Sequence, residues 1–295
     1  SWADIKGVDG ANSLRTLVNG AQGGRCSSGL CHISGGTAAG QNLFHRFSAF
    51  DTRGSIKGVR IQSDGYRNVI LGVINPLGSS IDTSVALSSK GNLFWLSPGG
   101  IYLGSGAGFV NVQQLQLSSA TGLRIGSGLF NALETTADQA GLLLDNPAQS
   151  HTALLTDTAT LSQIGLQNNG DLTLIDGSLT VEQSLLLDSQ GGNVLMQSAN
   201  LLVPAGALTI SGQQVSIKDS SLDVAHPSTT GGEIEIGGSQ LSLQNTHLNA
   251  SGGDGGGTIH LGGGFQGAPL HSGAPQATLT TADSSTTLRS DALLQ

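Results

Sequence analysis

The chain has 295 residues, of which only 11% are charged and 4% are aromatic, and its formal net charge is −8. Its 12 Lys and Arg residues are scattered, so the clustered cations that nucleic-acid binding needs are missing and no nucleic-acid partner is expected. No apolar run reaches the roughly 18 residues of a membrane span, and the first four residues do not form a signal peptide.

The composition favours short strands and turns over helices. The chain has 45 glycines and one methionine, and Ser, Thr, Asn, Gln, Leu, Val and Ile are abundant in the rest. Hydrophobic residues make up 37% of the chain, which is too many for a disordered chain with so few charges. The composition therefore predicts an all-β protein with many turns.

Residues 1–40 lack the regular spacing found later in the chain. Leu14, Leu17 and Val18 supply apolar side chains there, but without a repeat. Because the open end of a stack of strands invites pairing with other chains, we interpret residues 1–40 as an N-terminal cap on the first coil.

The only two cysteines lie within this segment. Cys26 and Cys31 are separated by four residues that include Gly29, a spacing that suits a small loop closed by a disulfide. Free thiols and a metal site with His32 and His45 are the alternatives, but no paired-histidine motif is present and no metal is expected. A disulfide would place the chain in an oxidising compartment.

Four short segments follow in a fixed order between residues 40 and 104. They are Asn42-Leu43-Phe44-His45-Arg46-Phe47, Asn68-Val69-Ile70, Ser80-Ile81-Asp82 and Asn92-Leu93-Phe94-Trp95-Leu96-Ser97-Pro98-Gly99-Gly100-Ile101. The last one contains a turn, in which Pro98 fixes its own φ and we expect Gly99 to adopt a positive φ.

From about residue 170 the sequence repeats itself. The apolar positions around Val215 and Leu222 recur 26 residues later, and those around Ile234 recur after 25. A period of 20 to 30 residues with three short strands and no helix predicts a right-handed parallel β-helix, in which each coil buries its apolar side chains against the next. Further strands are expected at residues 172–174, 179–181, 185–187, 208–210, 278–280 and 287–289.

Two other folds were weighed against this pattern. A β-sandwich would not repeat its strand positions, and calcium-binding nonapeptide arrays need a motif that residues 252–257 do not match. We interpret residues 252–257 as a flexible loop. The predicted organisation is a cap at residues 1–40, coils at 41–169, and further repeats at 170–295 that we expect to continue in a longer protein.

The segments between residues 42 and 104 resemble the secretion domain of two-partner secretion exoproteins, the filamentous-haemagglutinin-like family. Residues 42–50 are similar to that family's N-L-F-H-S-F-x-x-F, residues 68–82 to N-I-I-x-R-V-T-G-x-x-x-S-x-I-D-G, and residues 92–104 to N-L-F-L-I-N-P-N-G-I-I-F-G. Residues 256–267 resemble the repeat of related large exoproteins. The sequence departs from the family at Gly72, at Ile74 and at the turn at residues 97–100, while the triplet at residues 75–77 resembles another family motif at a different place.

The resemblance implies the secretion domain of a large adhesin- or haemagglutinin-like protein, secreted or held on the surface of a Gram-negative-type bacterium. The chain would cross the periplasm, be recognised by an outer-membrane β-barrel transporter, and nucleate β-helix folding outside the cell. We expect a monomer. The residues that the resemblance assigns to recognition are Asn42, Leu43, Phe44, His45, Phe47, Asn68, Val69, Ile70, Ser80, Ile81, Asn92, Pro98, Gly100 and Ile101.

Parallel β-helices also host polysaccharide-active enzymes, and autotransporter passengers share the fold. Glycoside hydrolysis needs two carboxylates at a set distance, but Asp219 and Asp223 lie beside Lys218 on what we expect to be a solvated surface. His45 is the one histidine within the recognition segments, where it either contacts the transporter or packs against the cap. We expect neither catalysis nor a cofactor, and keep the enzyme and the passenger as alternatives.

Overall fold

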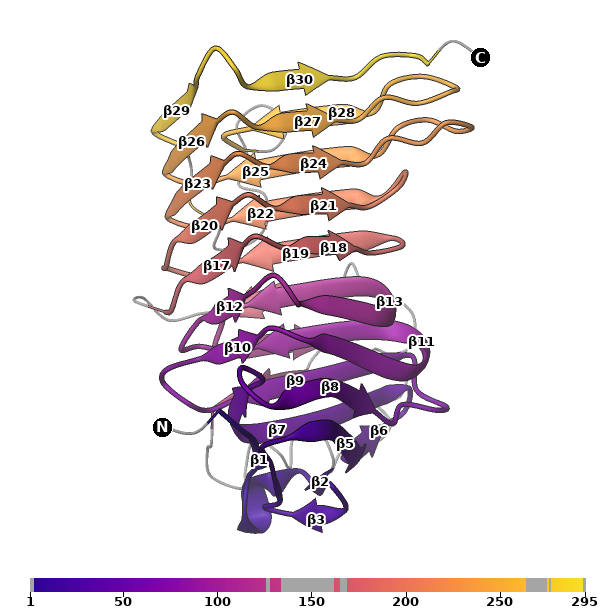
Figure 1. The fold of residues 1–295 in the computed structure, drawn as a ribbon, viewed down its shortest axis with the longest axis vertical. Coiled ribbons are helices and arrows are strands. Elements are labelled where there is room, and N and C mark those ends of the chain that lie inside the picture. Colours follow the sequence, from indigo (N-terminus) through magenta and orange to yellow (C-terminus); the bar gives the residue numbers. More distant parts are fainter. Residues whose placement is uncertain are drawn as a thin grey trace.

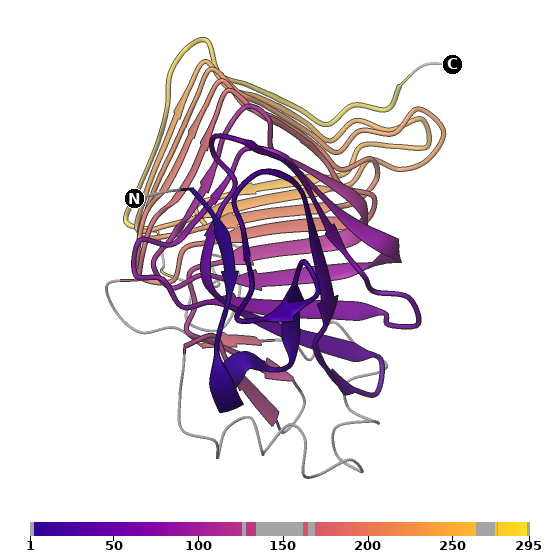
Figure 2. The ribbon, with the colours of Figure 1, turned by 60° about the horizontal axis from the view of Figure 1, so that its bottom comes forward.

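A computed structural model describes residues 3–125, 128–133, 162–164, 169–263, 275 and 277–293. Its strands are stacked along one axis with the two termini at opposite ends (Figure 1). In a view turned by 60° toward that axis, the later coils follow one another as nested three-sided outlines (Figure 2). The described part is nearly all β, and most of its strand pairs are parallel, so the predicted all-β parallel solenoid is confirmed.

Three faces run along the stack, and each complete coil from β10 (Ser79–Ile81) onward contributes one strand, or one part of a bent strand, to every face. The first face consists of β10, β12 (Ile101–Leu103), β17 (Leu172–Ile175), β20 (Val194–Gln197), β23 (Gln214–Lys218), β26 (Gln240–Gln244) and β29 (Leu279–Ala282). The second begins with β5 (Gly29–Gly35), β8 (Ile56–Ile61) and the first parts of β11 (Ser84–Leu96) and β13 (Gly108–Ser118). It continues with β18 (Ser178–Thr180), β21 (Asn200–Leu202), β24 (Ser221–Asp223), β27 (His247–Asn249) and β30 (Thr287–Arg289).

The third face carries most of the candidate site. It consists of β7 (Asn42–Asp51), β9 (Asn68–Val73), the second parts of β11 and β13, β19 (Ser184–Asp188), β22 (Ala207–Ser211), β25 (Glu233–Gly237) and β28 (Thr258–Leu261). β11 and β13 serve two faces each, because each passes around a corner where its pairing register shifts.

The core is a set of apolar columns that run along the stack. One column on the third face contains Leu43, Val69, Leu93, Leu115, Leu185, Leu208, Ile234 and Ile259, each paired with the next. All but Ile259 are buried, and each buried side chain stabilises the fold by about 1.5–3 kcal/mol. The repeat predicted from the sequence is confirmed, because Val215 pairs with Leu241 and Leu222 with Leu248.

Antiparallel strands gather at the N-terminal end of the stack. They are β1 (Ile5–Gly7), β2 (Thr16–Val18), β3 (Ala21–Gln22), β4 (Arg25–Cys26) and β6 (Thr37–Ala39), with a 3-10 helix at Gly10–Ser13 between the first two. β5 lies in the same segment but pairs in parallel with β8, so the parallel stack starts before residue 41. Cys26 and Cys31 form the predicted disulfide, with a Cα–Cα distance of 5.7 Å.

A small antiparallel sheet leaves the stack after β13. It contains β14 (Gly122–Ile125), β15 (Gly128–Asn131) and β16 (Ser162–Ile164), with β14 in the centre. The sequence predicted only coils for residues 41–169, and this sheet is an addition to them. The rest of that range, residues 126–127, 134–161 and 165–168, lies outside the described residues, as does the end of the similarity at 264–267.

Candidate functional site

The asparagines that begin three of the predicted segments stack on one another. On the third face Asn42 pairs with Asn68, and Asn68 pairs with Asn92. The following residues stay in register, so the Leu-Phe, Val-Ile and Leu-Phe dipeptides also form columns. The structure thus brings together three segments that the sequence only places in order.

The three asparagine side chains form a buried hydrogen-bonded ladder. Asn92 donates from Nδ2 to Oδ1 of Asn68 over 2.9 Å, and Asn68 donates from Nδ2 to Oδ1 of Asn42 over 2.8 Å. None of the three is more than 7% exposed. Within the described part the Nδ2 of Asn42 has no hydrogen-bond partner, so the ladder ends in an unsatisfied donor.

Side chains that follow the asparagines alternate between two cores. Leu43, Val69 and Leu93 belong to the interior column, because successive residues of a strand point to opposite faces. Phe44, Ile70 and Phe94 pack in a second cluster with Leu123 and Phe130 of the antiparallel sheet. The rings of Phe44 and Phe130 are 5.3 Å apart, so the outward side of the motif is covered by β14 and β15.

His45 lies inside the protein rather than on its surface. It is 0% exposed, its Nδ1 is 3.0 Å from Oγ1 of Thr16, and its ring packs near Phe47. Its Nε2 has no partner in the described part. Burial lowers the pKa of His45 to about 4, so the imidazole is neutral at pH 7. Of the two roles expected for His45, packing is therefore the one it has in the folded chain.

Arg46 is a site residue that the sequence did not reveal. It is 3% exposed, donating from one amino group to the carbonyl oxygen of Asn12 at 3.0 Å and from the other to that of Asn131 at 2.7 Å. Its guanidinium also lies over the Phe130 ring, 5.7 Å from the centroid. Arg46 thereby joins the N-terminal segment, β7 and β15. The only feature of the sequence that could have indicated this role is that Arg46 is a cation in a segment with several large apolar residues.

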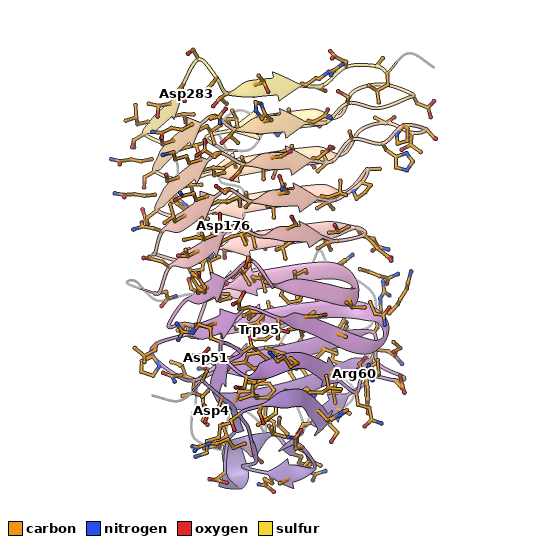
Figure 3. The ribbon with its side chains drawn as sticks, viewed as in Figure 1. Asp4, Asp51, Arg60, Trp95, Asp176 and Asp283 are labelled. Atoms are coloured by element: carbon orange, nitrogen blue, oxygen red, sulfur yellow. A yellow bond between two sulfur atoms is a disulfide. The ribbon has the colours of Figure 1, made fainter. Side chains whose placement is uncertain are left out.

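An aromatic group fills the coil behind β7. Phe47, Phe50 and Trp95 follow one another edge to face, with centroid distances of 5.2 and 4.4 Å. Trp95, labelled in Figure 3, is 0% exposed and donates from Nε1 to Oγ of Ser79 at 3.0 Å. Ser79 in turn donates to Oγ of Ser97 at 2.9 Å, so the indole N–H has a polar partner inside the core.

Two proline turns lie one above the other beside this group. The turns comprise residues 75–78 and 97–100. The N–H of Gly78 donates to the carbonyl oxygen of Asn75, and the N–H of Gly100 donates to that of Ser97, each over 2.8 Å. A Cβ on Gly78 would meet the carbonyl oxygen of Gly100, which shows how closely the turns stack. The expectation of a positive φ at Gly99 was wrong, because the positive φ of 110° belongs to Gly100, the residue after the central pair. The turn at residues 75–78, which the sequence analysis left without a role, is thus the structural counterpart of residues 97–100.

The remaining predicted residues are close to these turns. β10, with Ser80 and Ile81, pairs in parallel with β12, which begins at Ile101. Ile81, Gly100 and Ile101 are buried, while Ser80 and Pro98 are half-buried. All the other predicted recognition residues are buried, so the folded surface offers a partner almost none of their side chains.

The carboxylates considered for catalysis occupy turns and strand ends. Asp219 lies at the corner between β23 and β24 and has a positive φ of 51°. Asp219 accepts a hydrogen bond from Asn245, and Asp223 accepts one from the Ala225 N–H. Nothing in these contacts arranges a pair of carboxylates around a substrate.

The chain is similar to the HMW1 secretion domain from Haemophilus influenzae. The superposition covers 97% of this chain and 84% of the HMW1 domain, with a TM-score of 0.48 and 13% sequence identity. No family model matches the chain, and no curated protein matches it. Among the described residues no helix is long and apolar enough to cross a membrane.

Proposed function

We propose that this chain is the secretion domain of a two-partner secretion exoprotein, exported across an outer membrane by a partner transporter. The observation that carries the proposal is the register of the three asparagine-led segments, which stack residue on residue into one buried ladder. The same segments are the ones that resemble the family. Their order in the sequence therefore has a physical reason, because each segment forms the next rung of the same stack.

Burial of the motif determines when a transporter could recognise it. Asn42, Asn68 and Asn92 are inaccessible in the folded protein, so a partner that reads their amides must bind the chain before this stack forms. Each newly formed coil then buries part of the motif, which makes it inaccessible to the partner, and also buries apolar surface. In this proposal folding outside the cell both releases the chain and favours its further transfer.

The cysteine loop is compatible with such a passage. Cys26 and Cys31 are only five positions apart, so the disulfide closes a small ring and leaves the rest of the chain linear. An exported chain would acquire this bond in the oxidising periplasm. The adhesin or haemagglutinin activity of the complete exoprotein also belongs to the proposal.

The proposal is tested by expressing the chain behind a signal peptide, with and without a candidate transporter encoded beside it. Appearance in the medium only when the transporter is present is the expected result. Retention in the periplasm in both cases, with the chain folded, would contradict the proposal. A second measurement separates recognition from folding: a peptide of residues 40–104 should bind the transporter's periplasmic domains while unfolded.

The asparagines provide the matched variants for that peptide. Asn42→Ala with Asn68→Ala should weaken binding of the unfolded peptide at least severalfold. Mutating another amide residue of the same peptide that lies outside the predicted segments, Gln62→Ala, should leave binding unchanged. Equal binding by all three peptides would remove the recognition role from Asn42 and Asn68, whatever the variants do to the folded protein.

A further inference from the structure

Three metal-binding side chains meet on the outer surface of the third face near its C-terminal end. Glu233 and Glu235 lie two positions apart on β25, so both point outward from the same strand. His260 lies on β28 directly opposite Glu235. Each residue contributes one ligand atom, and these three atoms all lie within 4.8 Å of one another.

The distances between the ligand atoms are close to the ligand–ligand distances of a tetrahedral metal site. His260 Nδ1 is 3.4 Å from Oε1 of Glu235 and 3.9 Å from Oε1 of Glu233. Two ligands that each lie about 2.0–2.1 Å from a tetrahedral Zn²⁺ are about 3.3 Å apart. The Glu235–His260 pair already has this spacing, whereas the Glu233 oxygen has to move closer to enclose an ion, on parallel strands that hold the backbones at fixed spacing.

Among the described residues, His260 is the cationic partner recorded for the two carboxylates. In the described part of the chain the Lys and Arg ion pairs involve Asp4, Asp51, Glu182 and Asp291. Glu233 and Glu235 lie two positions apart on one strand, and their carboxylate oxygens lie within 4.8 Å of each other. The arrangement thus concentrates negative charge without neutralising it, which a divalent cation would correct.

The described positions paired with the two glutamates on the neighbouring strands are uncharged, apart from His260. On β22 Ala207 lies opposite Glu233 and Thr209 opposite Glu235, and on β28 Thr258 lies opposite Glu233. Glu233 and Glu235 each belong to a column of outward-facing positions that runs along the third face. In the N-terminal coils the column of Glu233 contains the asparagine ladder, and the column of Glu235 contains the covered Phe44, Ile70 and Phe94. The acidic pair and its histidine are therefore a local change in side-chain chemistry on a repeating backbone.

We propose that Glu233, Glu235 and His260 form a binding site for one Zn²⁺ ion, with a fourth position open to water. One imidazole and two carboxylates suit Zn²⁺ better than Ca²⁺ or Mg²⁺, which prefer oxygen ligands alone. The side chains of His260 and Glu235 are 28% and 22% exposed, so the ion has access from solvent. By joining β25 to β28, the ion would stabilise the packing of two successive coils.

The test is calorimetric titration of the metal-stripped chain with Zn²⁺ at pH 7.5. We expect one saturable site per chain, and a Glu235→Gln or His260→Ala variant should bind at least about tenfold more weakly. His247→Ala removes an exposed histidine that bonds Thr287 on the second face, and it should bind as the unmutated chain does. Because the site lies on the surface, all three variants should keep the far-ultraviolet circular dichroism of the parent.

Two further readouts identify the ligands directly. Co²⁺ in place of Zn²⁺ should give the visible absorption of a tetrahedral complex, and His260→Ala should abolish that absorption. Zn²⁺ should raise the melting temperature of the parent and of His247→Ala but not of His260→Ala. Absence of saturable binding, or undiminished binding by both Glu235→Gln and His260→Ala, would overturn the proposal.

Discussion

Asn68 and Asn42 are 26 positions apart in sequence, yet Nδ2 of Asn68 lies 2.8 Å from Oδ1 of Asn42 in a buried hydrogen bond. Asn92 extends the bond into a ladder. Each amide in such a column is aligned by the backbone register of the rungs. The ladder therefore depends on the same register that aligns the apolar columns beside it.

Replacing the middle asparagine should destabilise the domain strongly. Asn68→Ala removes both ladder bonds and leaves Nδ2 of Asn92 and Oδ1 of Asn42 buried without these partners. We expect a loss of about 2–4 kcal/mol in the free energy of unfolding, measured by urea denaturation. The exposed Asn200 on β21 provides the control, since Asn200→Ala should change the stability by less than about 0.5 kcal/mol.

The buried imidazole of His45 should make the fold sensitive to acid. Its pKa is about 4 in the folded chain, against 6.5 as the ordinary value, so the unfolded chain binds more protons between these two pH values. Stability should therefore fall as the pH decreases from 6.5 to about 4, by about 3 kcal/mol in total. Urea denaturation at a series of pH values measures this loss.

Carboxylates also titrate at the acidic end of that range, so the comparison needs a variant. His45→Gln should lose this part of the pH dependence, even if it is less stable at every pH. His247→Gln changes an exposed histidine and should retain the pH dependence of the parent. Parallel pH profiles for the parent and His45→Gln would show that His45 is not the group responsible.

Reducing the disulfide should cost a modest amount of stability. The bridge between Cys26 and Cys31 closes a short loop, for which the chain-entropy estimate is about 2 kcal/mol. We expect dithiothreitol to lower the free energy of unfolding by this amount in the parent. It should have no effect on a Cys26→Ala, Cys31→Ala double variant, which is also expected to be less stable than the oxidised parent.

The stacked proline turns should tolerate no side chain at Gly78. Its φ is 80°, and an added Cβ would meet the carbonyl oxygen of Gly100. Gly65 has a similar φ of 87° but nothing within 4 Å of an added Cβ, so Gly65→Ala isolates the cost of the backbone conformation, about 1–2 kcal/mol. Gly78→Ala should lower the melting temperature clearly further than Gly65→Ala, and equal effects would refute the close contact.

The repeat made the later coils predictable. Inward residues such as Leu222 and Leu248 are fixed by strand alternation and coil length, and both quantities are visible in the sequence. The N-terminal half was harder. β11 turns a corner within one strand, and β14 pairs with a strand nearly 40 residues further along, so neither follows a period.

The residues of the candidate site were selected by their resemblance to a family motif, and the sequence did not predict how deeply they are buried. A motif shows which positions resemble a family, but it does not show that Phe44 and Ile70 are covered by a sheet formed later in the chain. His45 and Arg46 illustrate the same limit, because their partners Thr16 and Asn131 are distant in sequence. The cap function of residues 1–40 and the transporter contacts stay predictions.

In the described part of the chain from β17 onward, each strand pairs with its neighbours on the same face, one coil earlier and one coil later, and this has a mechanical consequence. β20, for example, pairs with β17 and β23. A force applied at the C-terminal end would break the hydrogen bonds of one coil after another, so the coils would detach one at a time. Around β7 the load would be shared, because Arg46 joins the N-terminal segment to β15 across the stack. In an optical trap the domain should extend in small successive steps and then yield in one larger event.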